Sequence, residues 1–397
     1  MSTLRLRDVA RRHAPAYLAR FGDSVLPSHR AALQAICDCR TPKLGGHIAQ
    51  CATCGTEHEH FHSCRNRACP QCGHDATERW LARQRELLLP VPYFHVVFTL
   101  PAELRRLVRT HQRALLGALF QAAFESLSTL CADPKHLGAA QIGALAVLHT
   151  WTRTLEWHPH IHMLVPGGGL AADGRTWVTL RRRRKRPTPP ARPEPRKPFI
   201  VPVEALSIVF AACFARLALA AVPGLQLPKE VFHKRWVTFA KPVAKGPEKV
   251  LEYVGRYVHR TALSDKAVVA TDDESVTFKY RRTDDHQRRH MRLPAEESLR
   301  RFLQHVLPKG FHCVRSFGLL HPSRRTTLRR LQLLLAPRTT AAATAPATPP
   351  APTTKRRCRK CRGPLQLLRS LTRYECIARL ASAEHAPQSI TPMGSSP

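Results

Sequence analysis

The chain has 397 residues, a length that allows two or three domains. Its 63 lysines and arginines against 28 acidic residues give a formal net charge of +35, which favours a polyanionic partner. A GC-rich genome would also favour arginine, but it would not produce the ordered cysteine and histidine spacings described below. No run of eighteen apolar residues and no secretory signal is present. We therefore expect a cytoplasmic protein without membrane contact, whose thirteen cysteines are metal ligands rather than disulfides.

The apolar pattern predicts a chain of mixed helices and strands. Residues 1–36 are predicted to be helical, with breaks near Pro15 and Pro27, and residues 37–74 are rich in cysteine, histidine and glycine with little apolar period. Predicted helices then cover residues 77–89, 104–130, 201–222, 248–260 and 296–306. Predicted strands cover residues 93–100, 144–149, 160–165, 236–240 and 276–280.

Two biased segments interrupt this pattern. Residues 181–198 form a basic, proline-rich insertion that we expect to be exposed and flexible. Either a solvated linker or a DNA contact explains it. Residues 336–354 are rich in threonine, alanine and proline and are predicted to be a disordered linker.

The first chemical motif is a pair of cysteine knuckles. Cys51 and Cys54 form one C-x2-C motif, and Cys69 and Cys72 form another. Two such knuckles can complete the tetrahedron of one structural zinc ion, which would supply folding energy to a segment with little apolar core. Three further candidate zinc ligands lie in the same segment: Cys39, His47 and Cys64.

The second motif is His-x-His. On a strand, His160 and His162 point to the same face, because side chains alternate with a period of two. Two imidazoles on one face can hold a divalent ion that polarises a scissile phosphate. A plain surface or core histidine cluster is the alternative.

The third motif is a pair of tyrosines one helical turn apart, Tyr253 and Tyr257. Lys249, Arg256 and Arg260 lie on or beside their face and are candidate DNA-binding residues. Nearby positive charge favours the phenolate and holds a phosphate, as a nucleophilic tyrosine requires. Two tyrosines that only pack the helix are the alternative.

Together these motifs resemble the two-tyrosine HUH transposases of rolling-circle insertion sequences, with their N-terminal transposase zinc-binding domain. The resemblance covers most of residues 37–320. It rests on Leu44–His47, Ser63–Cys72, Tyr93–Pro101, His158–His162 and Glu252–Tyr257, which occur in the family's order.

The resemblance implies a site and a reaction. His160 and His162 would bind Mg or Mn, and Tyr253 and Tyr257 would be the nucleophiles. A tyrosine would attack a phosphodiester of single-stranded DNA, keep the 5′ phosphate as phosphotyrosine and free a 3′ hydroxyl. Two tyrosines would allow two linked strand transfers during DNA transposition, on DNA of the nucleoid.

The resemblance also implies the fold class, α+β: an N-terminal zinc-binding module plus an HUH-type antiparallel sheet with flanking helices. The predicted divisions are an N-terminal helical segment (1–36), a zinc-binding domain (37–90), a nicking domain (91–335), the linker (336–354) and a cysteine-containing tail (355–397).

Some points stay open at this stage. Either His149 or Glu156 could be the third metal ligand. The tail carries one C-x2-C, Cys358 and Cys361, with no evident second knuckle. A plasmid replication initiator or relaxase would share the histidines and a tyrosine, and a non-enzymatic zinc-dependent DNA-binding protein would share the charge and cysteines.

Overall fold

The computed structural model describes residues 4–179, 200–243, 249–250, 253, 255, 258, 261–282, 285, 287–336 and 357–384. The insertion at 181–198 and nearly all of the linker lie outside these residues. Tyr257, Arg256 and Arg260 also lie outside them.

The chain begins with helices α1 (Leu6–Phe21) and α2 (Pro27–Asp38). Pro15 lies inside α1, so the predicted break there is wrong. A proline costs one backbone hydrogen bond, but the buried stripe of α1 holds the helix together. The chain instead turns after Phe21, and the predicted break near Pro27 is confirmed. Pro27 takes the first position of α2, where its missing N–H costs no hydrogen bond.

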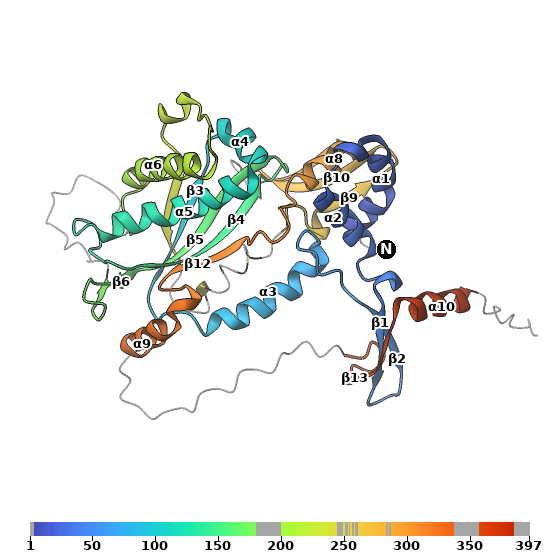
Figure 1. Ribbon diagram of the computed structural model, residues 1–397. Coiled ribbons are helices and arrows are strands. Elements are labelled where there is room, and N and C mark those ends of the chain that lie inside the picture. Colours follow the sequence, from blue (N-terminus) through green and yellow to red (C-terminus); the bar gives the residue numbers. More distant parts are fainter. Residues whose placement is uncertain are drawn as a thin grey trace, which may run out of the picture.

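The two N-terminal helices share a core with a segment far along the chain. This segment comprises β9 (Val268–Thr271), β10 (Ser275–Arg281), β11 (Arg288–Pro294) and α8 (Ala295–Leu303). The strands form an antiparallel sheet in the order β11-β10-β9, and α1 packs against α8 (Figure 1). The apolar side of α8 is buried in this core together with α1. We call this unit the N-terminal body.

A five-stranded sheet forms the centre of the molecule. Its order is β12 (Val314–Gly318), β4 (Gly143–Trp151), β5 (Trp157–Pro166), β3 (Tyr93–Thr99) and β8 (Thr238–Pro242), and every neighbouring pair is antiparallel. This confirms the α+β class. The predicted strands at 93–100, 144–149 and 160–165 are confirmed as β3, β4 and β5.

Helices α5 (Gln112–Ala132) and α6 (Val203–Ala221) cover one face of this sheet (Figure 1). Phe94, Val96 and Phe98 of β3 are buried on that side, in the largest apolar core. By length and composition alone both helices could cross a membrane, but they pack on each other and on the sheet as core helices do. Short elements at the rim are α4 (Arg105–Thr110), β6 (Gly168–Leu170), β7 (Trp177–Thr179) and α9 (Arg325–Leu335).

Helix α3 (Pro70–Arg85) runs from the N-terminal body beneath the opposite face of the sheet (Figure 1). It starts earlier and ends earlier than the predicted helix at 77–89, because Pro70 occupies its first position. Trp80 packs beside Tyr93 on that face. The described residues of the tyrosine segment, from Lys249 to Gly255, are helical as well.

The zinc segment is a hairpin that the apolar period did not predict. Strand β1 (Gly46–Cys51) pairs with β2 (Glu57–Phe61) on one side and with β13 (Leu365–Leu371) on the other, in the order β13-β1-β2. Helix α10 (Arg373–Glu384) follows. The tail therefore folds back onto the zinc segment (Figure 1).

Candidate active site and zinc sites

Three histidines from neighbouring strands meet on the sheet face opposite α5 and α6. His149 of β4 stands directly across from His160 of β5, and His162 follows two residues later on the same face. One nitrogen of each ring lies within 4.8 Å of the others. Ile161 points to the other face and is fully buried, as strand alternation requires. Of the two candidates for a third ligand, His149 joins the pair, whereas Glu156 is exposed and lies outside the group.

Two hydrogen bonds orient these rings. Nδ1 of His160 lies 2.8 Å from the backbone oxygen of His158, and Nδ1 of His162 lies 2.9 Å from Nε2 of His95. With Nδ1 engaged in each ring, Nε2 is the nitrogen that would bind an ion, the arrangement that outer hydrogen bonds impose on metal-bound imidazoles. Burial lowers the pKa of His160, which favours the neutral ring that a metal needs.

The donor set fits a divalent ion. Three neutral imidazoles suit a transition ion such as Mn²⁺ better than Mg²⁺, which prefers oxygen donors. A phosphate oxygen and water can complete the coordination. The ion, when bound, would polarise the phosphate as a Lewis acid.

His95 connects this histidine group to a tyrosine. Its Nδ1 lies 2.7 Å from the Tyr253 hydroxyl, and its ring is stacked on that of His162 with 5.1 Å between centroids. Burial, with smaller contributions from Lys241 and His160, lowers the pKa of His95 to about 3. The Lys241 ammonium lies 5.3 Å from the centre of the Tyr253 ring. One candidate nucleophile is thus one ring away from the histidine group.

The motifs in the sequence did not indicate His95. The available signal was a single histidine in the otherwise apolar strand at 93–100, on the side of the strand that carries Tyr93 and Val97. Of the other residues of the predicted tyrosine motif, the structure describes Lys249 but not Arg256, Tyr257 or Arg260. Lys249 is exposed in the same helical segment as Tyr253.

Eight cysteines form two separate groups of four. The first group is Cys39, Cys64, Cys69 and Cys72, and the second is Cys51, Cys54, Cys358 and Cys361. The prediction that one ion joins the knuckles at 51–54 and 69–72 is therefore wrong. Each knuckle has a different partner, because the tail brings a further C-x2-C onto β1.

The spacing within each group fits zinc. Cys72 Sγ lies 3.5 Å from Cys64 Sγ and 3.6 Å from Cys39 Sγ. Such separations are too long for a disulfide and close to the roughly 3.8 Å edge of a zinc–sulfur tetrahedron. All four ligands are protein thiols, so each site is closed and structural.

The second group has the same geometry. Cys51 Sγ lies 3.4 Å from Cys361 Sγ, and Cys54 Sγ lies 3.6 Å from Cys358 Sγ. A hydrogen bond with the Thr56 hydroxyl is the main cause that lowers the pKa of Cys54 to about 6, which favours a thiolate.

His47, the remaining candidate zinc ligand, lies outside both cysteine groups. Its ring lies instead beside those of His60 and His62, with centroids 5.3 and 5.7 Å away. Residue type alone could not separate it from the cysteines. Its position on β1 turns it towards other histidines.

A five-stranded antiparallel sheet carries a group of three histidines with a tyrosine beside it, and two four-cysteine groups lie outside that sheet, so the chain has the ligand sets of a metal-binding protein. Comparison with known families makes this specific. Residues 9–100 match the "Transposase zinc-binding domain" of IS91-type elements, and residues 143–327 match the family described as "Putative transposase".

Two relatives agree with these matches. The chain is 40% identical over 334 residues to the "Putative transposase y4qJ" of Sinorhizobium fredii, covering 79% of each chain. It is 32% identical over 300 residues to the "Transposase for insertion sequence element IS801" of Pseudomonas savastanoi pv. phaseolicola, covering 71% of this chain and 68% of the relative. No solved structure matches. The chain belongs to the IS91-type family of insertion-sequence transposases, a DNA-binding family with a zinc-binding domain.

Proposed function

We propose that this transposase nicks and rejoins single-stranded DNA through a phosphotyrosine intermediate, with Tyr253 as one nucleophile and Tyr257 as the second. The observation that carries the proposal is the contact chain from Tyr253 through His95 to His162. It holds a phenol beside a three-histidine metal face, as an attack on a metal-bound phosphate requires.

In the proposed reaction the phenolate oxygen of the tyrosine attacks phosphorus. A bond forms between that oxygen and phosphorus, and the bond from phosphorus to the 3′ oxygen breaks. The phenol loses its proton to solvent, and the 3′ oxygen takes a proton to become a hydroxyl. Reversal with a different 3′ hydroxyl rejoins DNA, so the chemical step needs no ATP.

We infer that His95 is a positioning residue rather than the base. When His162 keeps Nε2 for the ion, its Nδ1 carries the proton and donates to Nε2 of His95. The neutral His95 ring then carries its own proton on Nδ1 and donates to the oxygen of Tyr253. That hydrogen bond stabilises the phenolate and holds it in place.

The test is formation of a covalent protein–DNA adduct on single-stranded ends of the element. Replacing tyrosine by phenylalanine keeps the ring and removes only the attacking oxygen. The double change of Tyr253 and Tyr257 should abolish the adduct with DNA binding nearly unchanged, and Tyr374→Phe, an exposed tyrosine of the tail, is the matched control. Metal-dependent adducts from the double variant would refute the mechanism.

The metal is tested separately. Alanine at His160 or His162 should also abolish the adduct, and Mn²⁺ should support more of it than Mg²⁺ because the donors are nitrogens. His95→Gln should leave Mn²⁺ binding largely intact, raise the phenol pKa of Tyr253 and shift the pH profile of adduct formation upward. An unchanged profile would reject the positioning role.

The proposal gives each main domain of the chain a function. The zinc-binding domain at 37–90 binds DNA, the nicking domain at 91–335 carries the chemistry, and Lys249, Arg256 and Arg260 hold phosphates. We place the protein in the cytoplasm, acting on DNA of the nucleoid. The high positive charge predicts DNA affinity that falls steeply with salt.

A further inference from the structure

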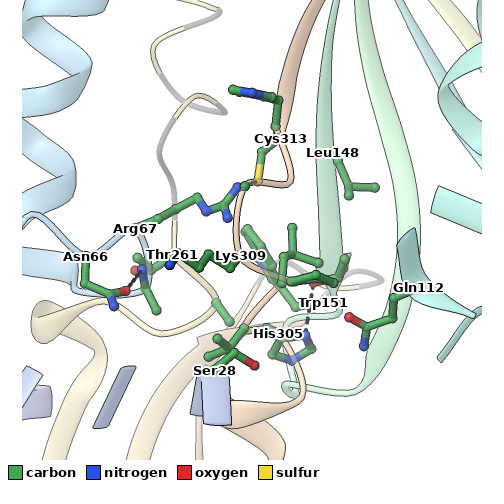
Figure 2. A pocket seen from close by; sticks show the side chains of 18 of the residues that line it. Ser28, Asn66, Arg67, Gln112, Leu148, Trp151, Thr261, His305, Lys309 and Cys313 are labelled. Atoms are coloured by element: carbon green, nitrogen blue, oxygen red, sulfur yellow. Dashed lines mark hydrogen bonds between the residues drawn. The ribbon is translucent and has the colours of Figure 1, made fainter. Parts of the chain in front are cut away.

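A cavity of about 1040 Å³ lies between the N-terminal body, the first cysteine site and the central sheet (Figure 2). Strand β4 contributes Thr150 and Trp151, the loop before α3 contributes Asn66 and Arg67, and the loop before β12 contributes Lys309. Its size is that of a site for a small ligand, too small for a DNA duplex.

The cavity borders the proposed metal face. The ring of Trp151 is stacked on that of His149, with 4.5 Å between centroids and 23° between planes. The rings of Trp151 and His305 form an edge-to-face pair, with 6.0 Å between centroids. Trp151 therefore both lines the cavity and contacts His149 of the histidine group.

The lining favours an anion with a flat apolar part. Trp80, Trp151 and Phe302 supply aromatic surface. Arg67 and Lys309 supply positive charge, and no aspartate or glutamate is among the residues found to line the cavity. The Arg67 guanidinium is fixed by donating to the backbone oxygen of Phe311, and it lies 2.9 Å from Cys313 Sγ. Figure 2 shows Arg67 beside Cys313. Aromatic platforms beside cations are how proteins bind unpaired nucleotides.

We propose that this cavity binds an unpaired nucleobase of the DNA strand next to the scissile phosphate, stacked on Trp151, with the adjoining phosphate held by Arg67 and Lys309. The inference rests on the proposed function, since it takes single-stranded DNA as substrate. It adds a subsite that fixes which phosphate reaches the ion.

The experiment measures binding without divalent metal, so that no cleavage occurs. Single-stranded oligonucleotides from the element end carry one abasic site, moved nucleotide by nucleotide past the nick, and dissociation constants are measured by fluorescence anisotropy. Loss of the stacked base should weaken binding about 5- to 100-fold at one or two adjacent positions only.

Two variants of the cavity are then measured with intact and abasic DNA, which gives a thermodynamic cycle between the cavity change and the loss of the base. Ala31→Trp, at an exposed lining position of α2, fills the cavity, and Trp151→Leu removes the stacking surface. In either variant the abasic penalty should vanish. Gln34→Trp, exposed on the same helix but outside the lining, should keep the full penalty.

Lys309→Ala tests the phosphate contact without touching the core. It should weaken all oligonucleotides alike and lower the salt slope by about one. An abasic penalty at no position, or one that persists in both cavity variants, overturns the proposal. Because binding and adduct formation are measured separately, failure of the nicking chemistry with an intact abasic cycle would overturn only the proposed function.

Discussion

The tail's cysteines give the sharpest test of the two-site arrangement. Cys358→Ser removes one ligand from the second group and leaves the first group untouched. Zinc content should fall from two ions per chain to one. If Cys51 and Cys54 instead shared one ion with Cys69 and Cys72, the tail variant would lose no zinc.

Loss of the second zinc ion should strongly destabilise the sheet β13-β1-β2, because the apolar core of this unit is small. Among the described residues, its apolar cluster has only three buried members: Ile48, Leu371 and Cys376. Each buried side chain of this kind contributes about 1.5–3 kcal/mol, whereas a structural zinc supplies about 10–16 kcal/mol. Without the second ion, β13 should therefore detach from β1 although six residue pairs join them.

The assay combines zinc counting by native mass spectrometry with limited proteolysis of the full-length protein. Cys358→Ser should show one zinc and rapid cleavage within the tail. Cys376→Ser is the matched control, because this cysteine is buried in the same unit but belongs to neither group. Two zinc ions in Cys358→Ser, or a protected tail with one ion, would refute the reasoning.

Two other predictions test the three-histidine group and the buried residues beside it. His149→Ala should weaken Mn²⁺ binding about 100-fold or more by calorimetry, while Glu156→Ala should match wild type; the reverse result would make Glu156 the ligand. Burial lowers the pKa of His305 to about 3, so the stability that its neutral ring contributes is complete above about pH 6.5 and declines below it by up to about 1.4 kcal/mol per unit. In urea unfolding, the stability advantage of wild type over His305→Gln should accordingly shrink as the pH falls below 6.5, and a constant difference would contradict the burial argument.

The local pattern of the sequence was sufficient to predict the central strands that carry the histidines. The strands at 93–100 and 160–165 are apolar segments bounded by turns, and strand alternation alone placed His160 and His162 on one face. Which third residue joins them depends on the register of β4 against β5. That register sets His149 opposite His160 and cannot be read from either strand by itself.

Long-range pairing explains what the sequence did not reveal. Cys51 and Cys358 are separated by more than 300 residues, and nothing local marks one C-x2-C as the partner of another. His95 carries no motif, and only the fold brings it between Tyr253 and His162. In each case the decisive fact is which strands become neighbours.

The two zinc sites stabilise different parts of the chain. Cys69 and Cys72 of the first site stand at the start of α3, and this helix supports the tyrosine segment further along its length. The Thr77 hydroxyl lies 3.3 Å from the backbone oxygen of Val258.

One turn later along α3, at Leu81, this helix again lies close to the tyrosine segment. A Cβ added at Gly255 would lie 3.0 Å from a methyl carbon of Leu81, so the absence of a side chain at this position lets the two helical segments meet. A zinc ion in the first site would hold the start of α3, and Leu81 of α3 lies against Gly255, two residues from Tyr253. The second ion, at the far end of the hairpin, instead joins the tail to β1. By this route the first zinc site would help to position Tyr253, the proposed nucleophile, whereas the second site completes the hairpin.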